Sequence, residues 1–428
     1  MGQTIAEKIL SRKNLAGESV KAGDVIEAAI DGIMIGRGLS TIDDTVKEGG
    51  LPEGIPELWD KDKMYVVVEH LQPPSNAQLA RRNQRTRATA KRLGVTHFHD
   101  AVPGIHHQIM FDSGYVRPGE LLVATDSHTP IYGALNVAGV SVGQPDLAYA
   151  MTFGKQWFRV PTTIKVVLKG RLPKYPIAKD IALFIAATYG DDVAQGRAIE
   201  YTGLIAEAMS LDSRMSLSAS STELGAMFAL FEADKKTLEY IRARTDLPFE
   251  PASPDPDARY ERIIEVDVDK LPFYVAKPHL FKNGVPVSET LGVKIDVAAI
   301  GACVNGRMED IIIAARILKG RKVHPDVRFI VQPASYGIAK QCMDTGLFQD
   351  LIDAGAQPLA PGCHVCHAHA PYLADGEVCI AATPRNYKGR LGSTEAFVYL
   401  ADPATVAASA IAGEIVDPTE VLHEIGLI

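Results

Sequence analysis

The chain has 428 residues, of which 46% are hydrophobic and 22% charged, a composition typical of a folded globular protein and unlike that of a disordered or fibrous chain. The formal net charge of −8 argues against the basic surface that nucleic-acid binding requires, so we expect small molecules as ligands and no nucleic acid. The length predicts two or three domains.

Neither secretion nor membrane insertion is expected. The N-terminal stretch MGQTIAEKILSRKNLAGE lacks the apolar run of a signal peptide, and no segment has the roughly eighteen consecutive apolar residues of a membrane span. Five cysteines are a sparse, odd count for a chain of this length, unlike the disulfide framework of a secreted protein. We therefore expect a cytoplasmic protein.

Short apolar runs alternate with segments of helical period. In chain order, the expected elements are a helix at 77–94, strands at 121–125 and 163–168, a helix at 179–190, a loop rich in Pro and Asp at 246–261, a helix at 308–320 and a strand at 327–335. This alternation predicts an α/β fold with ligands at the carboxyl ends of strands. Shifts in the pattern predict domains at 1–155, 156–280 and 281–428.

The segment LLVATDSHTP places Asp126, Ser127 and His128 directly after an expected strand. Asp126 or Ser127 can serve simply as a helix N-cap. Alternatively, Asp126 orients His128 and raises its basicity, which makes the imidazole a proton donor or acceptor. A serine nucleophile is disfavoured, because no G-x-S-x-G turn surrounds Ser127.

Further polar residues stand out in short motifs. Histidines occur in VVVEHLQPP (His70) and in VPGIHHQIM (His106 and His107), where a structural role is the simpler reading of each alone. RAIEYTG offers Glu200. Arg385 and Arg390 in TPRNYKGRLGS suit bidentate binding of carboxylates, although in isolation a solvated loop explains them equally well.

Cysteines appear at two places that suggest ligands. In IGACVNGRMED, Cys303 follows Gly-Ala at the end of an expected strand, where glycine lets the backbone approach a bulky ligand. A buried small hydrophobe is the competing interpretation. Cys363 and Cys366 form a C-x-x-C in APGCHVCHAHA, a spacing that fits zinc, a redox pair or an iron–sulfur cluster. His364, His367 and His369 could complete a zinc site, so the spacing alone leaves the metal open.

Taken in order, these segments resemble the aconitase superfamily over nearly the whole chain, and most closely its branch of 3-isopropylmalate dehydratase (isopropylmalate isomerase) and homoaconitase large subunits. The similarity is carried by segments spread along the chain: TIAEKIL, GIHHQ, RPGELLVATDSHTPIYGAL, IEYTG, SRMSLSASSTELGA, GACVNGRMEDI, PGC-x-x-C and RNYKGRLGS. The resemblance implies three α/β/α layered domains around a central cluster site, and a hydro-lyase that dehydrates and rehydrates a small 2-hydroxy di- or tricarboxylate in leucine biosynthesis.

The resemblance also implies roles for single residues. It makes Cys303, Cys363 and Cys366 the ligands of a 4Fe-4S cluster with one iron not held by protein, a Lewis acid. His128, paired with Asp126, would protonate the departing hydroxyl. The remaining implied site residues are His70 and His107, which support this network, Glu200, which hydrogen-bonds the reacting oxygen, and Arg385, Arg390 and Ser127, which bind substrate.

A serine base is missing from these motifs. In the two-subunit members of the family it lies in a swivelling domain on a separate small chain, so the resemblance implies a small-subunit partner and no swivel domain here. Several residues depart from the family pattern, namely Glu69, Ala302, Val304, Pro384, His367 and His369. They leave open a dehydratase for methylmalate, dimethylmalate (citraconate-forming) or homoaconitate, or a non-catalytic scaffold stabilised by zinc.

Overall fold

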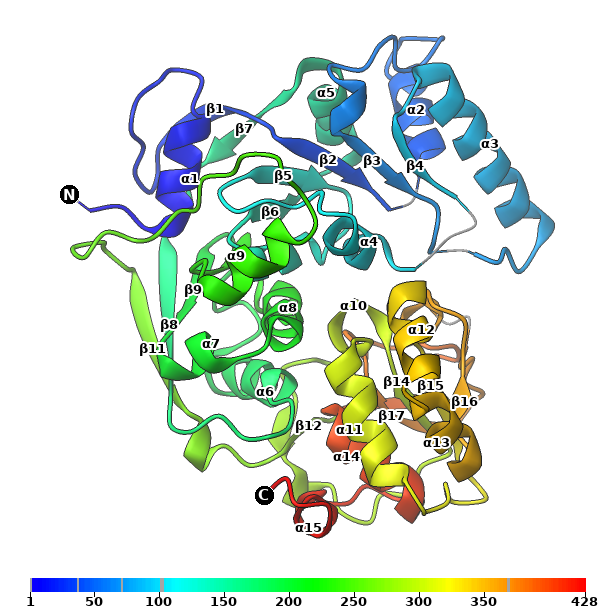
Figure 1. Ribbon diagram of the computed structural model, residues 1–428. Coiled ribbons are helices and arrows are strands. Elements are labelled where there is room, and N and C mark those ends of the chain that lie inside the picture. Colours follow the sequence, from blue (N-terminus) through cyan, green and yellow to red (C-terminus); the bar gives the residue numbers. More distant parts are fainter. Residues whose placement is uncertain (1, 37, 71, 101–103, 368–369) are drawn as a thin grey trace.

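The computed structural model describes residues 2–36, 38–70, 72–100, 104–367 and 370–428, and it builds them around four β-sheets flanked by helices (Figure 1). The first sheet has the order β4-β3-β2-β5-β6, with every pair parallel. Its strands are β2 (Gly32–Ile35), β3 (Met64–Val67), β4 (His97–His99), β5 (Leu121–Ala124) and β6 (Ala138–Ser141). The connecting helices are α2 (Leu39–Glu48), α3 (Ala77–Leu93), α4 (His106–Asp112) and α5 (Gln144–Phe153). Strands β2, β3 and β5 are apolar throughout and buried, as expected for the centre of a parallel sheet covered on both faces.

An N-terminal helix and a two-stranded ribbon precede and follow this sheet. Helix α1 (Ile5–Lys13) begins at a capping box in which Thr4 and Glu7 satisfy each other's backbone N–H groups. Strands β1 (Val25–Ala29) and β7 (Lys155–Arg159) pair antiparallel. The ribbon therefore ties the start of the chain to the end of the first sheet.

The second sheet is again parallel, with the order β10-β9-β8-β11. Its strands are β8 (Thr163–Lys169), β9 (Ala198–Thr202), β10 (Phe228–Phe231) and β11 (Arg262–Asp267). Its helices are α6 (Ala178–Tyr189), α7 (Leu204–Ala208), α8 (Leu211–Ser220) and α9 (Lys235–Arg242). The Pro- and Asp-rich stretch 246–261 joins α9 to β11 within this sheet, so it does not separate domains.

The third sheet has seven strands in the order β13-β12-β18-β17-β14-β15-β16. The strands are β12 (Tyr274–Ala276), β13 (Gly284–Pro286), β14 (Val297–Ile300), β15 (Arg328–Val331), β16 (Gln357–Pro358), β17 (Val378–Ala382) and β18 (Phe397–Leu400). The pairs of β12 with β13 and with β18 are antiparallel, and the other pairs are parallel. The helices are α10 (Ala302–Asn305), α11 (Met308–Leu318), α12 (Tyr336–Asp344), α13 (Leu347–Ala354), α14 (Pro403–Ala412) and α15 (Thr419–Glu424).

The expected α/β class is confirmed, and each expected helix and strand is present at its place with ends shifted by a few residues. The domain boundaries at 155 and 280 stay predictions; strand β12, although it precedes 280, belongs to the third sheet. None of the helices in the described ranges is long and apolar enough to span a membrane. The cytoplasmic location stays a prediction from the sequence.

A buried asparagine locks the first sheet to the second. Asn136 follows the short 3-10 helix η2 (Thr129–Leu135) in the left-handed conformation, with φ of 65°. Its Nδ2 donates to the carbonyls of Phe231 and Ala252, both at 2.9 Å, and its Oδ1 accepts from the backbone N–H of Ala252 at 2.8 Å. Within η2, Gly133 lies so close to β10 that a Cβ would stand 1.8 Å from the Ala229 carbonyl oxygen. The segment that follows His128 is thereby fixed against the second sheet.

Asn136→Ala is therefore expected to lower the free energy of unfolding by about 3 kcal/mol or more, because three buried backbone groups lose their partners and alanine disfavours positive φ. Urea unfolding followed by circular dichroism measures the change. Asn76→Ala removes an exposed N-cap of α3 and is the control, with an expected loss of about 1 kcal/mol. Equal losses in the two variants would contradict this account of Asn136.

Candidate active site

A cavity of about 320 Å³ lies where loops of the first and third sheets meet, with α4 on one side and α10 on the other (Figure 1). The loops that reach it follow the carboxyl ends of parallel strands β3, β5, β14 and β17, the usual place for ligands in such sheets. Its lining consists of His70, Ile105, His106, His107, Thr125, Asp126, Ser127, His128, Cys303, Cys363, Cys366, His367, Arg385, Tyr387 and Arg390. Of the predicted site residues, only Glu200 does not line this cavity.

All three predicted cysteine ligands face the cavity, and all are buried. Cys303 lies on α10, directly after the end of β14 and Ala302, whose φ of 65° turns the chain sharply. Arg307, itself buried, donates to the carbonyl of Cys303 at 2.6 Å and to that of Val304 at 3.2 Å. This guanidinium satisfies carbonyls that the short helix leaves open, so the turn presents the Cys303 sulfur in a fixed position.

The second and third cysteines belong to a loop that a buried glutamine holds. Gln332, at the end of β15, donates from Nε2 to the Ala360 carbonyl at 2.8 Å and accepts from the Val365 N–H at 3.1 Å. His364 contacts Gln332 Nε2 through Nδ1 at 3.0 Å and the Gln72 carbonyl through Nε2 at 2.6 Å. Both ring nitrogens of His364 are thus engaged away from a metal, which argues against a local zinc site built from C-x-x-C and this histidine.

Cys363 and Cys366 are electrostatically coupled: the hydrogen bond to Cys366, together with burial, raises the pKa of the Cys363 thiol well above its ordinary value. The hydrogen bond from the Cys363 thiol, with help from Arg390 and His128 against the opposing effect of burial, lowers the pKa of Cys366 to about 5. Arg390 donates from Nη2 to the Cys366 sulfur at 2.8 Å and from Nη1 to the Tyr387 hydroxyl at 2.7 Å. Three buried cysteines beside a guanidinium suit a soft-metal or iron–sulfur group, for which thiolates are the preferred ligands.

Asp126 holds His107. The Asp126 carboxylate contacts His107 Nε2 at 3.0 Å, and His107 Nδ1 contacts the Tyr132 hydroxyl, also at 3.0 Å. Burial, reinforced by neighbouring His106, lowers the pKa of His107 to about 3, so this imidazole is neutral. Although burial opposes ionisation of Asp126, the charges and hydrogen bonds of the surrounding histidines keep its pKa well below its ordinary value.

The expected pairing of Asp126 with the His128 imidazole requires correction. Asp126 Oδ1 accepts the backbone N–H of His128 at 2.9 Å, whereas the ring Nδ1 lies 3.8 Å away. The closest carboxylate to the His128 ring is that of Glu223, whose Oε1 is 3.3 Å from Nε2. The Asp126 carboxylate therefore binds the backbone of the following turn and the ring of His107. It is not an N-cap, because the N-cap of η2 is His128 and no side chain caps that helix.

Glu223 is a site residue that the sequence analysis missed. It also accepts from Arg385 Nε at 2.7 Å, and contacts with His128 and Arg385 outweigh burial and lower the pKa of Glu223. Although burial disfavours the charged imidazole, the Cys303 sulfur and Glu223 raise the pKa of His128 to about 10. The signal was available: Glu223 is the only acidic residue in SRMSLSASSTELGA, a segment that carries the family resemblance.

Glu200 lies elsewhere, and its predicted role in hydrogen-bonding the reacting oxygen is wrong for this geometry. Its side chain extends from β9 to the start of α1, where Oε1 accepts the Ile5 N–H at 2.6 Å and Oε2 accepts from the Tyr260 hydroxyl at 2.8 Å. The motif IEYTG thus anchors the N-terminal helix. Burial, only partly offset by these hydrogen bonds, raises the pKa of Glu200 to about 7.

Of the remaining residues singled out in the sequence, Ser127 and His367 line the cavity. The carbonyl of Ser127 accepts from Thr222 Oγ1 at 2.9 Å. The ring of His367 meets that of His70 edge-on, with centroids 5.3 Å apart. Ala302 and Val304 are fully buried, and His369 lies outside the described residues.

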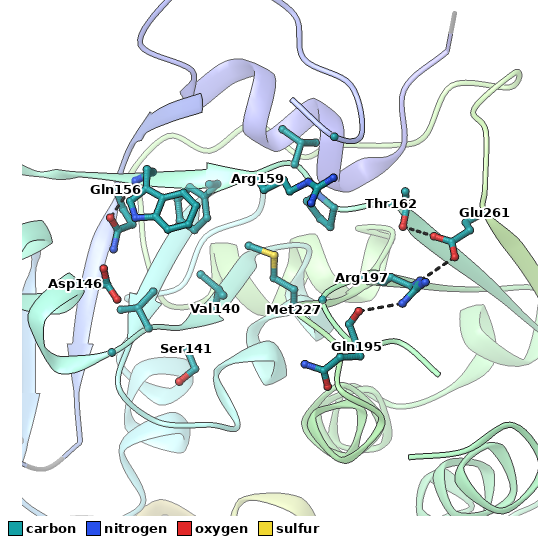
Figure 2. A pocket seen from close by; sticks show the side chains of 18 residues that line it. Val140, Ser141, Asp146, Gln156, Arg159, Thr162, Gln195, Arg197, Met227 and Glu261 are labelled. Carbon is teal, nitrogen blue, oxygen red and sulfur yellow. Dashed lines mark hydrogen bonds and ion pairs between the residues drawn. The ribbon is translucent and has the colours of Figure 1, made fainter. Parts of the chain in front are cut away.

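A larger hollow, of about 770 Å³, opens elsewhere, alongside β7 and the end of β6 (Figure 2). Its lining combines Trp157 and Met227 with polar residues, including the Arg197–Glu261 ion pair at 2.9 Å. It contains neither histidine nor cysteine among the residues that line it. The larger volume of this hollow therefore does not make it the candidate active site.

Three cysteines, histidines paired with carboxylates and two arginines around one cavity define an iron–sulfur hydro-lyase as the class of protein. The chain belongs to the aconitase family: it matches the sequence profile of the Aconitase family (aconitate hydratase) over residues 59–413. Membership implies an iron–sulfur cluster, and the expected family, fold class and hydro-lyase activity are confirmed.

Curated relatives extend this match over nearly the whole chain. The 3-isopropylmalate dehydratase large subunit 1 of Methanopyrus kandleri is 42% identical over 420 residues, which cover 98% of this chain and 99% of that protein. The 3-isopropylmalate dehydratase large subunit of Halothermothrix orenii is 42% identical over 99% of this chain and all of that protein. Large subunit 2 of Archaeoglobus fulgidus is 40% identical over the same shares. Their names imply that these proteins work with a small subunit.

Glu200→Gln is expected to flatten the pH dependence of stability. Because burial raises the folded-state pKa to about 7 from an ordinary value of 4.5, the folded chain binds a proton that the unfolded chain has lost between these values. Wild-type stability therefore falls as the pH rises through this window, by on the order of 3 kcal/mol, and glutamine removes the fall.

Urea unfolding at about pH 5 and about pH 8 measures this difference, because the two values bracket most of the window. Glu207→Gln, on the exposed face of α7, is the matched control. A Glu200→Gln variant that loses as much stability on the alkaline side as the wild type would contradict the assignment.

Proposed function

We propose that the chain is the large catalytic subunit of a 4Fe-4S hydro-lyase that isomerises 3-isopropylmalate, by removing water from this 2-hydroxy dicarboxylate and adding it back. One observation carries the proposal: sulfur ligands from the third sheet and carboxylate–imidazole pairs from the first and second sheets meet at a single cavity. The names of the relatives supply the substrate.

Cys303, Cys363 and Cys366 are the residues that would hold the cluster. Their fit rests on the donor set: three buried sulfurs on one cavity, with Arg390 donating to one of them. With three protein ligands for four irons, the cluster when bound supplies one iron as a Lewis acid that weakens the C–O bond of the substrate.

His128 is the proton donor for the departing hydroxyl. The Glu223 carboxylate, whose Oε1 lies 3.3 Å from Nε2, favours the protonated imidazole and orients the ring. As the C–O bond breaks, the proton passes to the leaving oxygen and completes a water molecule, and His128 becomes neutral. Because Glu223 stays ionised between His128 and Arg385, it favours return of the proton to the ring.

Arg385 and Arg390 are the cations that bind substrate carboxylates. Arg385 uses its Nε for Glu223, which leaves its Nη groups for a ligand, and Arg390 is held in place by Tyr387 and Cys366. Guanidinium groups bind carboxylates through two parallel hydrogen bonds, so a fixed arginine also orients the substrate. The backbone turn at Ser127 contributes to the same wall.

The second proton in the reaction leaves a carbon atom and requires a base. We propose that a serine of the separate small subunit takes it, because Ser127, the serine that lines the cavity, has no histidine base paired with it in the described chain. The carbon-bound proton then goes to the partner, while the C–O electron pair leaves with the hydroxyl group.

The direct test is anaerobic purification of the chain together with its small subunit, followed by iron and sulfide analysis and assays with a panel of hydroxy acids. Turnover of 3-isopropylmalate is expected to exceed that of methylmalate, dimethylmalate and homoaconitate. Preference for one of the latter would replace the substrate but keep the reaction. Stoichiometric zinc without iron would instead support the non-catalytic scaffold.

Cys303→Ser is expected to abolish both iron binding and activity, because a cubane held by two thiolates loses its third anchor. Iron content and visible absorbance after anaerobic reconstitution measure the loss. Cys342→Ser is the control, since Cys342 lies on α12 and contacts the Met308 sulfur at 3.8 Å outside the cavity. Full iron content in Cys303→Ser would contradict the ligand assignment.

Glu223→Gln is expected to lower kcat on the order of 10²-fold with little change in KM, because the proton donor loses the carboxylate that stabilises its charged form. Steady-state kinetics of the reconstituted complex, with cluster content measured in parallel, provide the check. Glu239→Gln on the exposed face of α9 is the control. An unchanged kcat would remove Glu223 from the proton-donating group.

A further inference from the structure

His106 is a buried histidine that the proposed reaction does not use. It lies at the start of α4, lines the cavity and is 1% exposed. Its Nδ1 is in hydrogen-bond contact with Glu69 Oε1, and its Nε2 stands 3.7 Å from Asp126 Oδ2. The ring is thus held by a hydrogen bond at Nδ1, while the buried Nε2 faces a carboxylate beyond hydrogen-bond distance, an arrangement that costs more desolvation than an apolar residue would there.

His70 spans the same two carboxylates. Its Nδ1 contacts the same oxygen of Glu69, and its Nε2 is 3.5 Å from the same oxygen of Asp126. The two imidazoles lie face to face, with ring centroids 5.1 Å apart and planes inclined by 18°. Glu69, His70, Asp126 and His106 therefore form a closed ring in which two histidines lie in parallel between two acids.

Both carboxylates of this ring are ionised. Although burial opposes ionisation, charges on His70 and His106 lower the pKa of Glu69 to about 2. A carboxylate oxygen only accepts hydrogen bonds, so the hydrogen bond with His106 Nδ1 places a hydrogen on that atom, and the close contact with His70 Nδ1 is favourable when that nitrogen also carries a hydrogen. Each Nε2 then faces Asp126 at the cavity wall, with its orientation set by the contact at the other side of the ring.

The backbone makes room for His106. Gly36 follows β2, and a Cβ built on it would stand 2.4 Å from His106 Nδ1 and 2.7 Å from Cε1. The φ of Gly36 is not in the left-handed range, so the backbone itself accepts alanine. The constraint at position 36 is therefore the imidazole of His106, and the two residues fit each other as a pair.

We propose that His106 is a positioning residue for the reaction: it shares Glu69 with His70, supports the face of the His70 ring and so holds His70 Nε2 towards Asp126 and the cavity. The inference rests on the proposed function, because His70 matters here as a member of the acid–base group. His106 acts through Glu69 and His70, and it does not touch the reacting atoms.

The test compares two variants of similar shape in the reconstituted complex. Asn at position 106 keeps an N–H donor near the place of Nδ1, whereas Leu has a similar branched shape without a donor. His106→Leu is expected to lower kcat about 10²-fold with KM within about threefold, and His106→Asn to stay within about fivefold of the wild type. Cluster absorbance and melting temperature are measured for each. Equal kcat values for the two variants would overturn the proposal.

Gly36→Ala provides an independent arm. The added methyl group must displace the His106 ring, so kcat is expected to fall as in His106→Leu. In the double variant Gly36→Ala/His106→Ala, kcat should be no lower than in His106→Ala alone, because alanine at position 106 has no atom beyond Cβ for the methyl group to displace. Multiplied losses would overturn the coupling. Gly337→Ala on α12, where the new Cβ meets only ordinary contacts at 3.5 Å or more, is the control.

Two further measurements distinguish the proposed role of His106 from failure of the proposed function and from a metal site at the same residues. A wild-type complex with cluster but without hydro-lyase activity would defeat the proposed function itself, whereas an active wild type with an active His106→Leu variant defeats only the role of His106. The donors of Glu69, His70 and His106 also lie within 4.8 Å of one another, as ligands of a single metal ion would. Stoichiometric metal that survives Cys303→Ser but is lost in His106→Leu would overturn the hydrogen-bonding role.

Discussion

The cavity depends on the neutralisation of three carboxylates, of which Glu69 is buried and Asp126 and Glu223 are half-buried. Glu69, Asp126 and Glu223 each lie within the wall, where an isolated charge would be strongly unfavourable. Each is instead held ionised by imidazole or guanidinium partners, which are fixed in turn. The acids and histidines are therefore mutually dependent: the same contacts that make burial tolerable also orient the groups that handle protons.

Much of the fold could be predicted from the sequence, because its strands and helices have clear periods. LLVAT is apolar throughout and became β5, and the segment 77–94 has helical spacing and became α3. The hydrophobic periodicity of a segment does not reveal which strands share a sheet. Strand β12 pairs with β18, more than a hundred residues later, and this contact moves the edge of the third sheet across the expected boundary at 280.

The site was predictable where residue type and motif agreed, and less so where contact between distant segments decides. Cys303, Cys363 and Cys366 line one cavity as expected. Asp126 and His128 are close in sequence, yet the strand-to-helix turn presents the backbone of His128 to Asp126 and leaves the ring to Glu223, which is 95 residues away. For Glu200 the motif suggested a role in the site that the fold does not support. Its position in β9 directs the carboxylate to the start of α1, where it accepts the backbone N–H of Ile5.

The origin of the groups around the cavity has a consequence for assembly. Every cysteine proposed as a ligand lies in a connection between strands of the third sheet, and Gln332 and Arg307, which hold those connections, belong to the same part of the chain. The proton-handling side chains come from the first and second sheets, and the His364 contact with the Gln72 carbonyl crosses between the two groups. The spacing of the sulfur atoms is thus a local property of the C-terminal third, whereas catalytic competence is a property of the closed molecule. The loops that carry the cysteines therefore receive most of their support from within the third sheet, whereas the acid–base groups reach them only through the packing of the three sheets against one another.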